Sequence, residues 1–378
     1  FYKELYPTSF EEPLFNIHLN VDFPFDLTGV LYFPKIKPNV EPQRNKIQLF
    51  QKQVFVTDSV EGIVPDFLTL LHGVIDSPDI PLNVSRSYLQ ADGNVKKIAS
   101  HITKKVADKL DEMFRKDRAD FESKWNDMKI IIEYGMLTED KFFDKAKKFA
   151  MYSDTDGGLH TFDAYLESIK EHQTDKDKKT VVLYASNKEA QHSYIQNAKS
   201  KGYSVLLLDS PLTSHLLQKL EQEHENTTFA RVDSDLIDNL IKKDETRVAK
   251  LSDKQKEELK TRLETIVPTE KFTLKLEDMD STEAPLVITV PEFMRRMKEM
   301  QMTGGGGMMG MGDFPDMYDL IVNANHPLAS KILDTEDADA RSSAVNQALD
   351  LAKLQQNLLH GEELTAFIAR SYEMLGNE

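Results

Sequence analysis

The sequence predicts an α/β fold in which mixed α and β regions follow one another along the chain. The predicted order is a β-sheet layer with helices, a helical connector, a small parallel α/β unit, and a mixed C-terminal region that ends in helices. Two observations predict it. The period of the apolar residues changes along the chain, and 40% hydrophobic with 29% charged residues is a globular composition. A length of 378 residues allows two or three domains that each bury a core.

The first region is predicted to hold the β-sheet layer. Apolar and polar residues alternate strictly from Phe15 to Asp22, which indicates a half-buried strand. Residues 30–33 form a second apolar run and a second strand. Residues 46–58 carry a third β region, in which two apolar groups fall out of phase, as at a bulge.

Helical patterns follow this layer. Residues 66–75 are predicted to be helical, residues 118–172 mainly helical, and the polar segment 171–179 a linker. Between the first two lies a helix of more than five turns that starts near Asn94. Its apolar residues recur every three or four positions: Val95, Ile98, Ile102, Val106, Leu110 and Met113.

The small α/β unit is predicted from three short apolar runs separated by helical patterns, at residues 180–184, 203–208 and 229–232. Runs of this kind are buried parallel strands joined by right-handed crossovers. The predicted domains are 1–245, with parts 1–117, 118–172 and 173–245, followed by 246–378.

The C-terminal region begins with a charged helix between Leu240 and Glu264, in which Ser252 and Gln255 form a capping box. Two strands are predicted at 272–276 and 286–290. A Met-rich helix, a glycine loop and a helical C-terminus complete the region.

Composition excludes several classes of function. The net charge of −16 opposes general nucleic-acid binding. The absence of cysteine excludes thiolate metal sites and cysteine catalysis, and fits a reducing compartment such as the cytoplasm. No apolar run is long enough to span a membrane. Because the chain starts at Phe1 without a methionine, we expect it to be the C-terminal part of a longer protein.

Familiar enzyme motifs are missing from the sequence. It contains neither a phosphate-cradling P-loop motif nor paired histidines at metal-binding spacing. The G-x-G-x-x-G match at Gly305, Gly307 and Gly310 follows a predicted helix rather than a strand, so we interpret it as a flexible loop. No bound metal is expected.

The Met-rich segment is the first candidate site. More than half of the 14 methionines lie between Met294 and Met317, next to four consecutive glycines. Unbranched, polarisable side chains suit a surface that repacks around varied apolar partners, but ordinary core packing explains them too. The candidate residues for binding unfolded proteins are Met294, Met297, Met300, Met308, Met309 and Met311.

Two further candidates depend on position. Arg86 is the only cation between Val74 and Val95, and an arginine on a loop presents a planar fork to a phosphate, although it is more commonly a solvated charge. Two amphipathic segments separated at His360-Gly361 need either the rest of the domain or a second copy to cover them. The candidate dimer interface is Leu349, Leu359, Leu364, Phe367 and Ile368.

Several short runs across the chain resemble one known family. They are Phe1-Tyr2-Lys3, Val54-Phe55-Val56-Thr57-Asp58, Gly73-Val74-Ile75-Asp76-Ser77, Leu82-Asn83-Val84-Ser85-Arg86 with Leu89-Gln90, Ala284-Pro285-Leu286-Val287, and Asn325-His326-Pro327-Leu328. In these runs the sequence resembles the 90-kDa heat-shock-protein chaperones, most closely the bacterial HtpG type, through their middle and C-terminal dimerisation domains.

The resemblance implies an ATP-dependent homodimeric chaperone for unfolded client proteins. ATP with Mg would bind in an N-terminal domain that precedes Phe1, act in cis, and meet the catalytic loop of the middle domain. Arg86 and Gln90 would be the catalytic residues, Arg86 reaching the γ-phosphate, and Asn83 and Ser85 would shape the loop. The chain alone would then be an inactive part of an ATPase.

The sequence departs from the family pattern at three positions. Ser87 stands where an acidic residue is common, Gln53 where an arginine is common, and His215 where some bacterial members place a client-contacting tryptophan. Two alternatives remain open: a stand-alone enzyme with a flavodoxin-like nucleotide site at the ends of strands 180–184 and 203–208, and a pure dimerisation scaffold.

Overall fold

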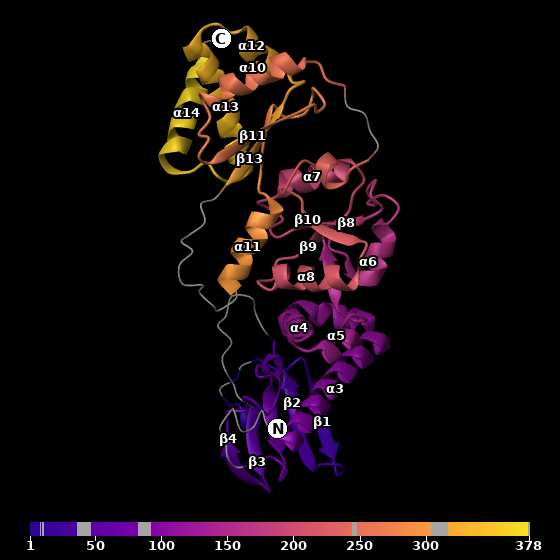
Figure 1. Cartoon of the computed structure of the whole chain (residues 1–378). Helices are drawn as coiled ribbons and strands as arrows, with labels where there is room; N and C mark the ends of the chain where they lie inside the picture. Colours follow the sequence, from indigo (N-terminus) through magenta and orange to yellow (C-terminus); the bar gives the residue numbers. More distant parts are fainter. Residues whose placement is uncertain are drawn as a thin grey trace. The chain divides into compact units, whose positions relative to one another are not determined.

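A computed structural model describes residues 1–7, 9, 11–35, 47–81, 92–243, 248–303 and 317–376 (Figure 1). The chain divides into two compact units. Unit 1 contains Phe1–Ser153 and Leu159–Tyr165, and unit 2 contains Asp154–Gly158 and Leu166–Glu378. Both units combine helices with sheets, so the predicted α/β class is confirmed. The predicted domain boundary at 245/246 falls inside unit 2 and stays a prediction.

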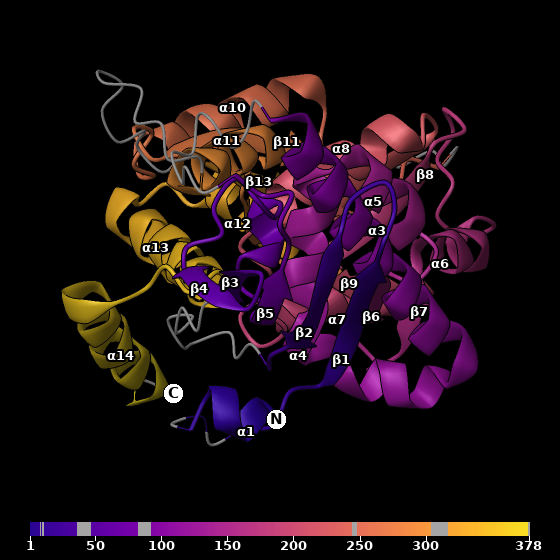
Figure 2. The same cartoon turned by 90° about the horizontal axis from the view of Figure 1, so that it is seen from below.

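Unit 1 is built on a five-stranded sheet of order β1-β2-β5-β3-β4. Its strands are β1 (Phe15–Val21), β2 (Leu27–Phe33), β3 (Ile47–Gln51), β4 (Val54–Thr57) and β5 (His72–Asp76). Figure 2 shows β1 and β2 side by side, and their pairing is antiparallel throughout. The β3–β4 hairpin shifts register between Leu49 and Phe50, which confirms the predicted bulge.

The predicted helix at 66–75 is wrong for its second half. Only a short 3-10 helix forms, η1 (Asp66–Leu68), and the chain then enters β5 at the centre of the sheet. Gly73 explains the outcome, because it has a φ of +143° and a Cβ there would lie 2.2 Å from the Val30 carbonyl oxygen. Glycine disfavours a helix and permits this close approach of β5 to β2.

Helices pack beside this sheet. The helix α1 (Tyr2–Leu5) opens the chain, and the long α3 (Gly93–Lys116) follows the predicted stripe. Next come α4 (Arg118–Thr138), which buries Trp125, and α5 (Asp140–Ala146). Five of the six stripe residues of α3 are buried, and Met113 is half-buried. This stripe is therefore the core face of an ordinary amphipathic helix.

The region 118–172 is less uniformly helical than predicted. After α5 the chain forms an antiparallel hairpin of β6 (Met151–Asp154) and β7 (Leu159–Thr161), followed by α6 (Phe162–Ile169). The Asp154 carboxylate accepts hydrogen bonds from the amides of Asp156 and Gly158, both 2.8 Å, and so shapes the turn. Strands this short leave almost no alternation to detect.

The first part of unit 2 is a parallel α/β arrangement, as predicted. The strands β8 (Thr180–Ala185), β9 (Val205–Leu207) and β10 (Thr227–Arg231) pair in parallel with β8 between the other two. The helices α7 (His192–Ser200) and α8 (Thr213–Glu223) connect them. A short α9 (Ile237–Leu240) follows β10.

The second part of unit 2 contains a sheet of order β11-β13-β12. Its strands are β11 (Phe272–Glu277), β12 (Leu286–Thr289) and β13 (Tyr318–Asn323), of which β13 was not predicted because helix was expected there. The helix α10 (Asp253–Glu264) starts at Ser252 with the predicted capping box to Gln255, so the predicted start near Leu240 is wrong.

Four helices complete unit 2. They are α11 (Glu292–Thr303), α12 (Pro327–Asp334), α13 (Ala338–Gln355) and α14 (Gly361–Gly376). A core of α10, α12, α13 and the three strands is continuous, and α13 contributes to it. All of α14 is described, and none of its residues is buried.

Candidate functional site

The predicted catalytic loop lies outside the described residues. Asn83, Ser85, Arg86 and Gln90 all fall within residues 82–91, for which the structure gives no placement. The segments on either side of this loop are described, and they determine where its two ends are held.

The described chain before residue 82 is fixed to the ends of neighbouring strands by side chains. Gln51 Nε2 donates to the carbonyl oxygens of Pro78 (3.2 Å) and Ile80 (3.3 Å). The Asp79 carboxylate accepts from the Asp26 amide at 2.7 Å, and Ser77 Oγ donates to the Asp26 carbonyl oxygen at 2.5 Å. These side chains satisfy backbone hydrogen-bonding groups of Asp26, Pro78 and Ile80, none of which lies in a strand.

The chain after the loop enters α3 through an N-cap. The Asp92 carboxylate accepts from the amides of Asn94 (2.8 Å) and Val95 (3.1 Å), which leaves α3 with a defined start. The described residues on both sides of 82–91 are thus hydrogen-bonded within unit 1.

Gln53 has a backbone role at the β3–β4 turn. Lys52 and Gln53 both have positive φ values, +51° and +67°, and their amides donate to the Asp76 carboxylate at 2.8 and 2.7 Å. The turn is therefore tied to the C-terminal end of β5, immediately before the loop segment, whichever side chain stands at position 53.

Buried aromatic groups hold α1 on unit 1. Tyr2 Oη bonds to His72 Nδ1 at 2.7 Å, and Tyr6 Oη both donates to the Gly73 carbonyl (3.1 Å) and accepts from its amide (2.7 Å). Burial lowers the pKa of His72 to about 4 and raises the pKa of Tyr6 to about 12. Both groups are neutral at neutral pH, as expected for polar side chains buried without a counter-charge.

The second candidate site is α11, whose buried face is charged. Arg295 is only 7% exposed, and its guanidinium bonds to Glu292 and Glu299, both at 2.6 Å, and to Tyr184 Oη. Its Cζ also lies 5.5 Å from the centre of the Tyr184 ring. The guanidinium of Arg295 therefore points at β8 and its neighbours, whereas Glu299 is 38% exposed at its side chain and Lys298 is exposed.

The adjacent arginine extends this contact to α8 and β10. Arg296 bonds to Glu292 (2.7 Å), to Glu221 of α8 (2.9 Å) and to the carbonyl oxygen of Phe229 in β10 (2.8 Å). Burial alone would raise the pKa of Glu292, but Arg295 and Arg296 outweigh it and hold that pKa below its usual range. The carboxylate is thus charged and paired, which is how a protein accommodates buried ions.

The opposite face of α11 is apolar and exposed. Phe293 is 71% exposed and Met297, one turn later on the same face, is 38% exposed, whereas Met294 is half-buried. This helix thus inverts the usual arrangement, with ion pairs inside and apolar side chains outside. Of the predicted Met residues, the side chains of Met300, Met308, Met309 and Met311 lie outside the described part.

Sequence reasoning missed Phe293 and the arginines of this site. A signal was present, because Glu292 and Glu299 flank Arg295 and Arg296 at spacings of three and four, which is the spacing of ion pairs on one helix face. The residue spacing in the sequence therefore already predicts two faces for this helix, one ionic and one apolar.

The residues of the predicted dimer interface do not share one environment. Leu349 and Leu359 are buried in the chain itself, Leu364 and Phe367 are half-buried, and Ile368 is 44% exposed. The C-terminal half of α14 exposes further apolar side chains, namely Tyr372, Met374 and Leu375.

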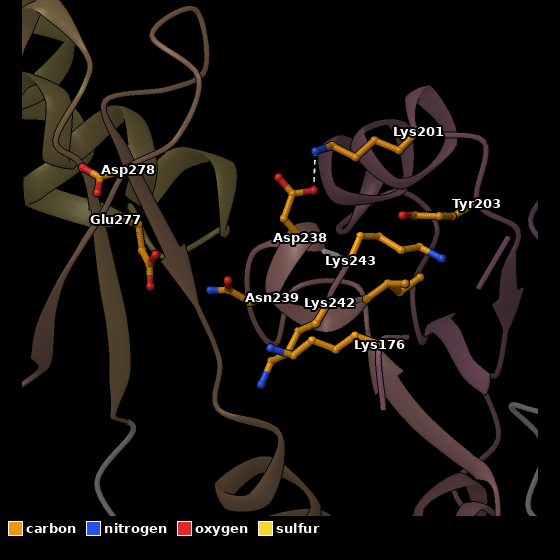
Figure 3. A pocket seen from close by; sticks show the side chains of 10 residues that line it. Lys176, Lys201, Tyr203, Asp238, Asn239, Lys242, Lys243, Glu277 and Asp278 are labelled. Atoms are coloured by element: carbon orange, nitrogen blue, oxygen red, sulfur yellow. Dashed lines mark hydrogen bonds and ion pairs between the residues drawn. The ribbon is translucent and has the colours of Figure 1, made fainter. Parts of the chain in front are cut away.

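A pocket of about 620 Å³ in unit 2 has basic and acidic walls (Figure 3). Lys201 pairs with Asp238, and Lys243 donates to the carbonyls of His172 (2.9 Å) and Thr174 (2.7 Å). The other two lysines that line this pocket, Lys176 and Lys242, are solvent-exposed. Exposed lysines without a glycine-rich turn do not make a nucleotide site.

After β8, four backbone amides are paired within their own turn. The amides of Ser186 and Asn187 donate to Gln191 Oε1 at 2.8 and 3.0 Å. The amides of Glu189 and Ala190 donate to Asn187 Oδ1 at 3.0 and 2.9 Å. Backbone amides that would cradle a phosphate are already paired, which weighs against the flavodoxin-like enzyme.

The described residues offer neither a metal-binding group nor a membrane-spanning helix. They contain no group of three or more acidic or histidine side chains placed to hold a metal ion. In the same residues, no helix combines the length and the apolar character needed to cross a membrane.

Comparison with known proteins gives one consistent family. The family model described as Hsp90 protein matches residues 1–376. The chain is similar to "Chaperone protein HtpG" of Porphyromonas gingivalis, with 53% identity over 358 residues that cover 94% of this chain and 52% of that protein. It is also similar to "Chaperone protein htpG" of Bacteroides fragilis, with 46% identity over 442 residues, 99% of this chain and 65% of that protein. The chain thus spans about half to two thirds of the length of these relatives.

Proposed function

The chain belongs to the Hsp90 protein family, and on that premise we propose that it is the middle and C-terminal part of an ATP-dependent cytoplasmic chaperone. In this proposal it binds unfolded or partly folded client proteins and forms a homodimer. The observation that carries the client-binding part is the polarity of α11, which keeps Phe293 and Met297 in solvent while Glu292, Arg295 and Arg296 are paired on the covered side.

An exposed apolar face on a seated helix suits clients of varied sequence. Methionine and phenylalanine gain contact area with many apolar side chains, and a methionine adapts its shape to each. Individual contacts are weak, so affinity in the proposed homodimer comes from several contacts made together on two copies. A folded protein buries most of its apolar side chains, so it has few that could bind the apolar face of α11.

Aggregation suppression tests the client surface. We expect the double variant Phe293→Ser with Met297→Ser to suppress aggregation of denatured citrate synthase less well than the unchanged chain. The matched control is Val248→Ser, which removes another exposed apolar side chain of unit 2. Equal suppression by the unchanged chain and the double variant would exclude α11 as the client surface.

The proposed ATP chemistry depends on the loop at 82–91. Arg86 would meet the γ-phosphate of ATP bound with Mg in an N-terminal domain of the full-length protein, and Gln90 would support it. ATP supplies a phosphoanhydride whose γ-phosphoryl group develops charge as it transfers. The anchors at Gln51, Asp79 and Asp92 support this role because they fix both ends of the loop.

Turnover of the full-length protein tests this role. Arg86→Ala should lower ATP turnover about 10–1,000-fold while ATP binding stays nearly unchanged, because the fork acts on charge that develops during transfer. Gln90→Ala should show a smaller loss. Turnover at the original rate in Arg86→Ala would leave that arginine a solvated charge. Separately, micromolar ATP binding by residues 1–378 alone would revive the enzyme alternative.

The proposed homodimer interface is the exposed side of α14. Ile368, Tyr372 and Leu375 expose apolar area, and Leu364 and Phe367 are half-buried beside them. A two-fold contact would count each of these residues twice. Leu349 and Leu359 support the interface indirectly, since they pack the helices that carry it.

Sedimentation of point variants tests the dimer. Ile368→Asp with Leu375→Asp should convert the dimer to a monomer at micromolar concentration, because each introduces a charge on the apolar face. A truncation after Ala340 is a poor test, since it also deletes the core residues of α13. Val248→Asp is the control, and a double variant that stays dimeric would move the interface elsewhere.

A further inference from the structure

The contact between α11 and the parallel α/β part of unit 2 is made mainly of charged and polar groups. Glu292, Arg295, Arg296 and Glu299 project from one side of the helix, and each has a partner on α8, β8 or β10. Ser214 of α8 completes the contact by donating its hydroxyl to Glu299. We call these four charged residues of α11, together with their partners on α8, β8 and β10, the α11 seat.

The groups that receive the two arginines are themselves held in place by further hydrogen bonds and ion pairs. Tyr184 Oη donates to Glu292 at 2.9 Å and also contacts the Arg295 guanidinium. Glu221 receives Arg296 and, through Oε1, also accepts the Phe229 amide at 2.8 Å. Arg231 is held by Asp233 at 2.6 Å and lies 3.8 Å from Glu299. Each charge is thus shared by at least two groups, as in a cooperative network.

An apolar helix surface can rotate or slide over an apolar core with little loss, but a forked guanidinium cannot. Arginine bonds its partners in fixed directions, and a buried ion that loses its partner is strongly unfavourable. If the apolar face of α11 turned inward, Phe293 and Met297 would be buried while Arg295 and Arg296 lost their bonds. The seat therefore specifies which face of α11 meets water.

We propose that Arg295 and Arg296 are positioning residues that hold α11 with its apolar face in solvent. This inference rests on the proposed client surface for its biological meaning, but it concerns the free chain. Tyr184, Glu221 and Glu299 serve as the fixed receivers on which the two arginines dock. Loss of the seat lets α11 leave α8 for part of the time, which exposes the surface beneath the helix, and lets the apolar face turn inward when the helix returns.

The absence of cysteine from the chain makes a direct test possible. A single cysteine introduced by Met297→Cys reports the outer face, and a separate one introduced by Ser214→Cys reports the surface beneath α11, where Ser214 is 4% exposed. Each is combined with Arg295→Met, which keeps the length of the side chain but removes its charge. Arg370→Met on α14 is the control, because its partners are Gln347 and Asp350.

We expect the thiol of the Ser214→Cys chain to react with a maleimide at least about tenfold faster in the Arg295→Met background, because local opening then needs less free energy. The thiol of the Met297→Cys chain should react more slowly as the apolar face turns inward. Arg370→Met should change neither rate, and Arg295→Lys should restore both in part. Arg296→Met is a second variant in case Arg295→Met does not fold, judged by hydrogen exchange in β8 and β10.

Unchanged labelling of both thiols in a folded Arg295→Met or Arg296→Met chain would overturn the proposal. No client is present in this experiment, so its outcome is independent of aggregation suppression. If the seat controls labelling but Phe293 and Met297 prove irrelevant to clients, the positioning role stands and the client surface falls.

Discussion

The helices α3 of unit 1 and α11 of unit 2 carry apolar residues at the same helical spacing and place them on opposite sides. In α3 the apolar stripe is buried and Lys96, Lys97 and Lys104 face water. In α11 Arg295 is buried and Phe293 and Met297 face water. Spacing tells which residues share a face, and the neighbouring elements decide which face is covered.

The difference lies in what those neighbours offer. The sheet of unit 1 presents apolar side chains to α3, so burial of the stripe removes apolar area from water. The surface under α11 presents a hydroxyl from Tyr184 and a carboxylate from Glu221, which match arginines and not methionines. A helix with charged residues inside is stable only where such partners are already in place.

The largest effect is expected for the core of α3. Ile102→Ala should lower the free energy of unfolding of unit 1 by about 2–5 kcal/mol, since Ile102 is fully buried and its loss leaves a cavity. Urea unfolding followed by the fluorescence of Trp125, which is buried in unit 1, measures it. Lys104→Ala on the exposed side of the same helix is the control. Equal effects of the two changes would mean that α3 is not a core helix.

The second prediction concerns His72, which is buried in unit 1 without a counter-charge, unlike the paired arginines of α11. The pKa of His72 is lowered by burial from 6.5 to about 4, so between these values the unfolded chain binds a proton that the folded chain does not. Stability is therefore complete above about pH 6.5 and falls as the pH drops toward 4, by up to about 3 kcal/mol.

The variant His72→Phe isolates this effect. It removes the titrating group, so the stability of unit 1 should depend less on pH between 6.5 and 4 than in the unchanged chain. The comparison uses slopes, because His72→Phe also removes the hydrogen bond to Tyr2. Parallel slopes for the two proteins would show that His72 is accessible to protons in the folded state.

Much of the fold follows from local patterns in the sequence. The α3 stripe, the β1 alternation, the capping box of α10 and the parallel strands β8 to β10 are each predicted by a period or a cap, and all are confirmed. The exceptions are β5, β6, β7 and β13. β6 and β7 are only four and three residues long and β5 contains Gly73, so their pairing partners determine their conformation. β13 is six residues long, and its apolar run at 320–322 is a local signal that was overlooked.

The candidate site was less accessible to sequence reasoning. Composition indicated apolar binding in the Met-rich segment, but Phe293 was overlooked because a single phenylalanine has no pattern. The orientation of α11 depends on Tyr184 and Glu221, which lie 108 and 75 residues from their partners along the chain. No local period encodes such long-range pairs. The roles of Arg86 and Gln90 stay predictions.

A smaller effect is expected where the seat loses one hydroxyl. Tyr184→Phe keeps the ring but removes the donor to Glu292 and a contact of Arg295, which should cost unit 2 about 1–3 kcal/mol. Hydrogen exchange of the α11 amides measures the local part of this loss. Tyr372→Phe, the same deletion on the exposed side of α14, should be nearly neutral. If Tyr184→Phe were equally neutral, the seat would not depend on that hydroxyl.

The smallest effect on the free energy of unfolding is expected for a substitution at Met297. The same substitution at a buried methionine, Met128, serves as the comparison. Met297 and Met128 both lie in helices, but Met128 of α4 is fully buried and Met297 is 38% exposed. Glutamine has nearly the helix propensity of methionine, so the substitution tests burial alone. Met297→Gln should change the free energy of unfolding by less than about 0.5 kcal/mol, whereas Met128→Gln should cost several times more because it buries an unpaired amide. Thermal or urea unfolding compares the two directly. A loss at Met297 as large as that at Met128 would place its side chain in the core, and the inverted polarity of α11 would then have no basis.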